Sequence, residues 1–115
     1  MNFLKMGIYN TLHLKNVVCL NCQHTQNWIA QFHYGDCWQF EYQLFDELRW
    51  NGNDTGAPGA SIVLVEGITE KGCQQCSSEF YVRIFIDDNK IVSASLAVKN
   101  IRFPEEAEDD YWVIN

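Results

Sequence analysis

Positive charge is scarce in this chain of 115 residues, which carries eight Lys and Arg residues against fifteen Asp and Glu residues. The formal net charge is −7 and the isoelectric point is near 4.7. A protein that binds nucleic acid directly needs a cationic face that displaces counterions from the phosphates. The composition therefore disfavours nucleic-acid binding and favours a protein partner with a basic surface.

Long apolar runs are also missing, since no stretch approaches the ~18 residues that a membrane-crossing helix needs. Residues 1–6 lack a charged leader followed by an apolar stretch and a cleavage site, so we expect no secretory signal. The expected location is cytoplasmic, where thiols stay reduced. The length and an apolar share of 47% predict a single domain over residues 1–115.

Catalytic signatures are absent as well. The chain has no Ser/His/Asp order, no H-E-x-x-H, no phosphate-binding glycine motif and no nucleotide fingerprint. Cys37 could serve as a nucleophile only with a base, and His33 is the candidate close in sequence. We favour the alternative that Cys37 is a small core residue. The sequence therefore predicts a protein that is not an enzyme.

What the chain does have is a repeated cysteine pair, Cys19-Leu20-Asn21-Cys22 and Cys73-Gln74-Gln75-Cys76. In a reducing compartment, two C-x-x-C motifs beside β-like runs are the ligand pattern of a tetrahedral four-cysteine zinc site. The alternatives are unligated buried cysteines, His24 as a ligand in place of one cysteine, and a redox motif, but a redox C-x-x-C normally opens a helix after a strand. Four thiolates fill the coordination sphere, so we expect one structural Zn²⁺ per chain. Its predicted ligands are Cys19, Cys22, Cys73 and Cys76.

Alternation of apolar and polar residues predicts a mainly β fold with no helix of ordinary length. The expected strands are residues 11–18, 27–34, 40–45, 61–66, 79–86 and 91–98. The hairpin of residues 79–98 is the clearest element, with a turn at 87–90 and a core face made of Phe80, Val82, Ile84 and Ile86. Breaker residues predict a loop over 51–60. We expect a zinc-ribbon-like antiparallel sheet with two C-x2-C knuckles and a long inserted middle.

Acidic residues are concentrated near the end of the chain, where residues 104–115 contain five acids and no base. Most acidic runs are solvated, but this one is followed by four apolar residues, which favours an acidic C-terminal tail that docks on a basic partner. Trp50 and Trp112 are candidate aromatic anchors. The predicted partner-binding residues are Trp50, Asn53, Asp54, Glu105, Glu106, Asp109, Asp110 and Trp112.

Several strings resemble a family of small bacterial zinc-ribbon-like proteins. They are Met6-Gly7-Ile8-Tyr9-Asn10-Thr11, Tyr34-Gly35-Asp36-Cys37, Tyr42-Gln43-Leu44-Phe45-Asp46-Glu47-Leu48 and the two cysteine pairs. Family members typically begin Met-Gly-Ile-Tyr-Asp-Thr and carry a Gly-Asp-Glu-Leu-like stretch, so Asn10 and Phe45 stand where Asp and Gly are expected. A start at Met6 would make residues 1–5 an extension. The resemblance implies a zinc ribbon, and some such proteins are immunity partners of polymorphic toxins, including Rhs-type toxins.

These expectations combine into one predicted function. We expect a non-enzymatic immunity-type protein that binds and blocks a cognate bacterial toxin domain and contains a structural zinc. Many toxins that act on nucleotides or nucleic acid have basic clefts, against which an acidic inhibitor gains association rate and specificity. The alternative is a zinc-ribbon adaptor that binds nucleic acid or the transcription machinery.

Overall fold

The computed structural model describes residues 8–101 and 110–114, and within these ranges the regular structure is entirely β. The prediction of a mainly β fold is confirmed. The strands are β1 (Asn10–Val18), β2 (Thr25–Phe32), β3 (Gly35–Asp36), β4 (Glu41–Gln43), β5 (Asp54–Thr55), β6 (Ile62–Thr69), β7 (Tyr81–Asp87), β8 (Lys90–Ala97) and β9 (Tyr111–Val113). None of the described segments forms a long apolar helix of the kind that crosses a membrane.

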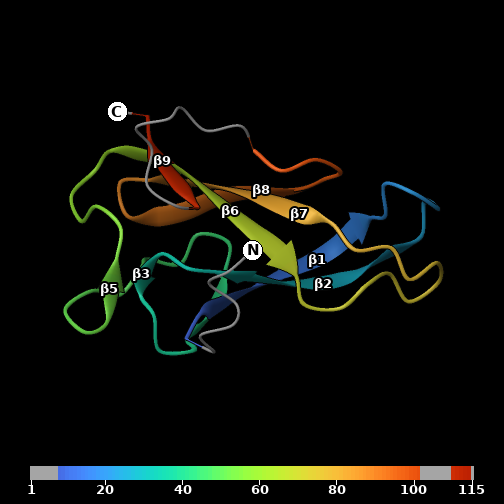
Figure 1. Ribbon diagram of the computed structural model, residues 1–115, viewed down its shortest axis with the longest axis horizontal. Helices are drawn as coiled ribbons and strands as arrows, with labels where there is room; N and C mark the ends of the chain where they lie inside the picture. Colours follow the sequence, from blue (N-terminus) through green and yellow to red (C-terminus); the bar gives the residue numbers. More distant parts are fainter. Residues whose placement is uncertain (1–7, 102–109, 115) are drawn as a thin grey trace.

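Seven of the strands form one sheet in the order β4-β1-β2-β6-β7-β8, with β9 paired to β6, and β3 pairs with β5 in a small second sheet (Figure 1). The predicted antiparallel arrangement is wrong at one place, because β4 runs parallel to β1. A parallel pair cannot be joined by a tight turn. The chain instead returns to the edge of β1 through residues 33–40, which include the two-residue strand β3.

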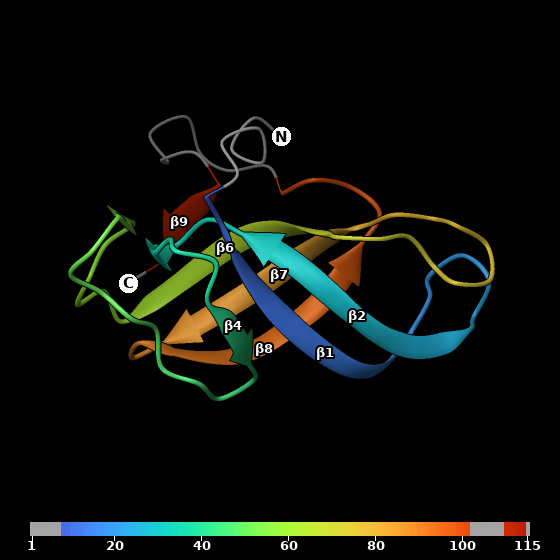
Figure 2. The same cartoon turned by 90° about the horizontal axis from the view of Figure 1, so that it is seen from below.

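The sheet curls until its two ends meet (Figure 2). The amide of Phe45, just after β4, donates to the carbonyl oxygen of Ile91 in β8 at 2.6 Å. The amide of Leu48 donates to the carbonyl oxygen of Asn89 at 2.9 Å. The close approach of β6 to β2 depends on Gly67 of β6, where a Cβ would lie 2.5 Å from a backbone carbonyl oxygen of β2. A residue without a side chain is required there.

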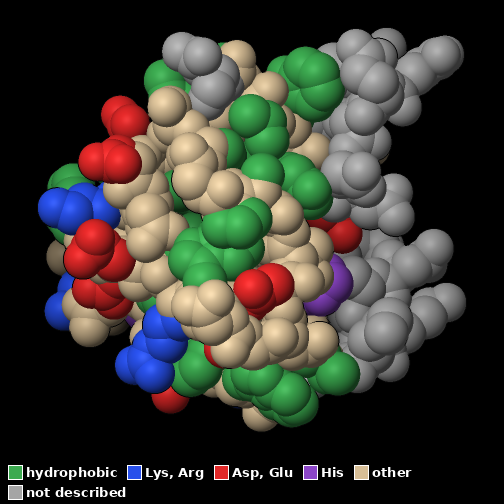
Figure 3. All heavy atoms as spheres, turned by 90° about the vertical axis from the view of Figure 1, so that its left-hand side faces the viewer, with side chains coloured by type: hydrophobic (Ala, Val, Ile, Leu, Met, Phe, Trp, Pro, Cys, Tyr) green, Lys and Arg blue, Asp and Glu red, His purple; other side chains and the backbone are tan. Residues whose placement is uncertain are grey.

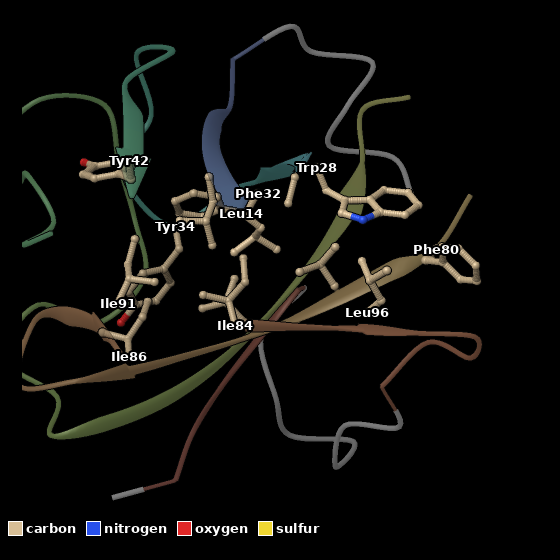
Figure 4. Packing of buried hydrophobic residues seen from close by; sticks show 14 of the residues in the cluster. Leu14, Trp28, Phe32, Tyr34, Tyr42, Phe80, Ile84, Ile86, Ile91 and Leu96 are labelled. Carbon is tan, nitrogen blue, oxygen red and sulfur yellow. The ribbon is translucent and has the colours of Figure 1, made fainter. Parts of the chain in front are cut away.

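The concave face of the curled sheet holds the core, in which side chains from β1 and β2 face those of β7 and β8 (Figure 4). The ring of Trp28 meets Phe80 edge-on, with centroids 5.8 Å apart. Val82, Ile84 and Ile86 are at most 1% exposed, so the predicted core face of the 79–98 hairpin is confirmed. Each such burial contributes about 1.5–3 kcal/mol relative to an exposed position.

Turn chemistry explains where two strands end. The β7–β8 hairpin turns at Asp88 and Asn89, with φ of 50° and 68°, which suits a type I′ turn and residues that tolerate left-handed backbone. The strand expected over residues 40–45 stops at Gln43, because Phe45 has a φ of 74°. This is the position where the resemblance led us to expect glycine.

Within residues 110–114 the chain forms a strand of the main sheet and not a free tail. Tyr111–Val113 forms β9 and pairs with Val63–Val65 of β6, extending the edge of β6 that β2 occupies further along. Residues Glu105, Glu106 and Asp109 lie outside the described residues. The strand predicted over residues 61–66 is longer than expected and continues to Thr69.

Candidate metal centre

The two cysteine pairs occupy equivalent places in two hairpins. The first knuckle connects β1 to β2 and the second connects β6 to β7. In each loop the amide of the first cysteine donates to a carbonyl oxygen five residues later at 2.8 Å, from Cys19 to His24 and from Cys73 to Ser78. Both loops lie at the same end of the molecule, at the right in Figure 1. The fold therefore brings together two pairs that are 50 residues apart.

Each knuckle also directs a backbone amide at its own first sulfur. The amide of Asn21 donates to Sγ of Cys19 and that of Gln75 donates to Sγ of Cys73, both at 3.4 Å. A hydrogen bond to the charged form of a thiol favours the thiolate. The repeated C-x-x-C spacing thus supplies both the ligands and the donors that stabilise their ionised form.

The four sulfurs form a compact cluster, with all ligand atoms within 4.8 Å of one another. Two short distances join sulfurs of different knuckles, 3.7 Å from Cys19 to Cys76 and 3.6 Å from Cys22 to Cys73. A disulfide needs about 2.0 Å between sulfurs. Four sulfurs bound tetrahedrally at about 2.3 Å from a zinc ion lie about 3.8 Å apart. The four predicted residues do come together, and their spacing is compatible with a tetrahedral zinc site.

The sulfurs differ in how readily they ionise. The Ser78 hydroxyl and amide beside Cys76 lower the pKa of that thiol to about 6. At Cys73, burial raises the pKa, but amides of its own loop outweigh burial and lower it. At Cys22, the His24 amide favours the thiolate, yet burial and the neighbouring thiols raise the pKa to about 12. Full ionisation of sulfurs this close calls for a bound cation, and Zn²⁺ suits soft thiolate ligands.

Polar side chains connect the two knuckles outside the sulfur cluster. Asn21 donates through Nδ2 to Oγ of Ser78 at 2.9 Å and lies 3.5 Å from Sγ of Cys76. Gln26 at the start of β2 accepts from the amide of Gln74 at 2.8 Å. Such outer contacts orient metal ligands. Sequence reasoning missed them, because the spacing of the cysteines does not reveal which residues face the opposite knuckle.

The fifth cysteine lies apart from the cluster and in the core, as expected. Cys37 is fully buried and its Sγ donates to the carbonyl oxygen of Gly35 at 3.3 Å. Burial raises the pKa of this thiol to about 11, which keeps it protonated at neutral pH. The ring of His33 lies 3.4 Å from Oγ1 of Thr55, and burial lowers its pKa. These surroundings favour packing over nucleophilic chemistry.

The described residues of the predicted partner surface fall in two places. Trp50 is half-buried, donates through Nε1 to Asn89 at 2.7 Å and meets the ring of Tyr34 edge-on. Asn53 and Asp54 are exposed in the 51–56 loop, where Asp54 accepts from backbone amides of its own turn.

Asp110 and Trp112 lie instead at β9, and both are half-buried. Among the aromatic residues that the structure describes, Phe45 and Trp38 are the most exposed, at 68% and 58%. Sequence reasoning passed over both of them, since exposure of one aromatic residue in a loop leaves no periodic signal.

A scan against protein-family models, a search of curated proteins and a search of solved structures each found no match for this chain.

Proposed function

We propose that this protein is a non-enzymatic immunity-type protein that binds a cognate bacterial toxin domain and blocks its active cleft. The observation that carries the proposal is a four-sulfur site with tetrahedral spacing in a chain of net charge −7. Such a site holds a structural zinc with no position open for substrate. The zinc fixes the fold, and the acidic surface makes the functional contact.

Charge supports a basic partner. An acidic protein associates faster with a basic cleft than a neutral one does, and like charges disfavour the wrong partners. The buried, protonated thiol of Cys37 adds support for binding over chemistry, because a nucleophilic cysteine acts as a thiolate. The residues that the sequence predicts for this contact are Trp50, Asn53, Asp54, Glu105, Glu106, Asp109, Asp110 and Trp112.

The test begins with the genes that flank this one and co-expresses the protein with a toxin domain encoded there. We expect growth to be restored and the purified toxin to lose activity in proportion to added protein, with complete inhibition at one equivalent. Inhibition by a small fraction of an equivalent would mean turnover and would contradict a stoichiometric inhibitor. Recovery of RNA polymerase as the bound partner would favour the zinc-ribbon adaptor instead.

A further inference from the structure

The end of the molecule away from the knuckles exposes two adjacent apolar side chains, Leu44 at 36% and Phe45 at 68%. They lie in the turn after β4, which hydrogen-bonds to the start of β8. Figure 3 looks onto the end that carries β5 and the β7–β8 turn, where hydrophobic side chains reach the surface beside acidic ones. An exposed apolar residue by itself needs no explanation. The backbone conformation of Phe45 does need one.

Phe45 adopts left-handed backbone with a φ of 74°. A side chain with a Cβ is disfavoured there, and a bulky residue is an outlier, whereas glycine or asparagine would be relaxed. The ring is mostly solvent-exposed, so packing within the chain does not offset this strain. A strained residue at the surface indicates that its side chain serves a purpose outside the fold.

The turn that presents Phe45 is held firmly. Its amide donates to Ile91 at 2.6 Å, and Asn89 is tied to the same loop. Nδ2 of Asn89 donates to the carbonyl oxygen of Leu48 at 3.0 Å, while its Oδ1 accepts the indole N–H of Trp50 at 2.7 Å. The backbone that carries the ring is therefore held in place before any partner arrives, and a segment that is already ordered loses less conformational entropy on binding.

The charged residues around the Phe45 ring indicate what kind of partner fits this surface. We call Leu44–Glu47 together with Asp87–Lys90 the Phe45 surface; the amide of Ile91 and the carbonyl oxygen of Asp46 join the two at 3.1 Å. Its charged residues are four acids and one base, a formal charge of −3: Asp46, Glu47, Asp87, Asp88 and Lys90. All five are exposed. An apolar centre with an acidic rim matches a basic surface that contains an apolar pocket.

We propose that the Phe45 surface docks on a basic protein, with the Phe45 ring entering an apolar pocket and the rim acids facing Lys and Arg side chains. Under the proposed function that partner is the toxin domain, and the inference rests on the proposed function for the partner's identity only. A second copy of this chain would bring two acidic rims together, so like-charge repulsion disfavours self-association through this surface.

The first experiment identifies what touches this surface. A photoreactive phenylalanine analogue, p-benzoylphenylalanine, replaces Phe45 or, as a control, Val98, which is 69% exposed beyond the far end of β8. We expect illumination of the producing cells to cross-link one basic protein from position 45 and not from position 98. No cross-link from 45, a cross-link from 98 alone, or a cross-link from 45 to a second copy of this chain would overturn the proposal.

The second experiment measures binding of the purified cross-linked protein. Asparagine tolerates left-handed backbone, so Phe45→Asn removes the ring while the turn keeps its shape. We expect its dissociation rate to rise about 30-fold or more, as for an anchor residue. Glu47→Gln with Asp88→Asn should lower the association rate and flatten its dependence on salt. Val98→Ser and Glu79→Gln, both near the knuckles, are the matched controls and should bind as the unaltered protein does.

Two outcomes separate this inference from the proposed function. If Phe45→Asn binds within about twofold of the unaltered protein, the docking surface is wrong, even where the protein still inhibits the toxin. If Phe45→Asn loses binding to a basic protein that is no toxin, the docking surface stands and the immunity function fails.

Discussion

The two ends of this molecule are built on different principles. At the knuckle end, two loops repeat the same cysteine spacing and the same hydrogen bonds, and the residue after each second cysteine, Gln23 or Ser77, has a φ near 67° (68° and 66°). At the other end, the turn after β4 and the β7–β8 turn share no pattern and are joined through Asn89, which bonds to Leu48 and Trp50. The first end therefore joins two loops of the same kind, and the second joins segments that have no common pattern.

The largest effect should come from breaking the knuckle end. Cys73→Ser removes one of four ligands, so we expect it to lose zinc and on the order of 5 kcal/mol or more of folding free energy, because metal binding in such sites is coupled to folding. Metal analysis and urea unfolding measure both. Cys37→Ser, a buried cysteine outside the cluster, is the control and should keep one zinc per chain. Less than half an equivalent of zinc in the unaltered protein would refute the site.

The next effect concerns the strand pair that links the two ends. Ile84 is fully buried on the concave face of β7. Truncation by Ile84→Ala should cost about 2–5 kcal/mol, because the surrounding core cannot fill the cavity. Phe85→Ala, on the opposite face and 37% exposed, should cost clearly less in the same urea titration. Equal costs would mean that both faces of β7 contribute alike, against the burial that the structure gives.

The contrast between these ends also explains what the sequence could predict. The 79–98 hairpin could be predicted because Phe80, Val82 and Ile84 alternate with polar or exposed neighbours, and this alternation indicates which side chains are buried. The sulfur cluster could be predicted because each C-x-x-C motif places two cysteines on one turn. Both signals lie within a few residues, where local chemistry decides the structure.

Pairings between strands that are distant in sequence could not be predicted in the same way. The three-residue strands β4 and β9 are too short to carry a periodic signal, and their partners lie 30 or more residues away in sequence. The parallel pairing of β4 with β1 follows from the path of residues 33–40, which includes the buried Asp36 and its bond to the amide of Asn53 at 2.6 Å. Such contacts depend on the assembled fold, so the hydrogen bond from Trp50 to Asn89 could not be predicted from the sequence.

A smaller effect of opposite sign should appear at the Phe45 end. Phe45→Asn should stabilise the fold by about 1 kcal/mol, because asparagine relieves the left-handed strain of a bulky residue. Phe45→Ala is the matched control, since it removes the ring but keeps a Cβ in the same backbone conformation. Urea unfolding should rank asparagine above alanine. If the two variants are equally stable, strain does not distinguish this end from the knuckle end.

The smallest expected effect tests a group that belongs to neither end. Glu66 in β6 is 5% exposed, pairs across the sheet with Arg83 and accepts the amide of Ile101 at 2.5 Å. Burial raises its pKa above the ordinary value of 4.5, so the folded state holds this proton more tightly than the unfolded state does. Stability from this group therefore falls as pH rises from about 4.5 through the raised pKa, and the penalty persists at neutral pH.

Glu66→Gln keeps an oxygen for the amide of Ile101 and removes the charge. We expect the variant to be more stable than the unaltered protein at pH 7 and equal to it below about pH 4, where Glu66 is protonated in both states. Urea unfolding across this range measures the difference. Glu79→Gln, exposed near the knuckles, controls for the loss of one negative charge from a chain of net charge −7. A variant that is less stable at pH 7 would mean that the charged carboxylate is needed to hold Ile101, and that its hydrogen bond outweighs the cost of burial.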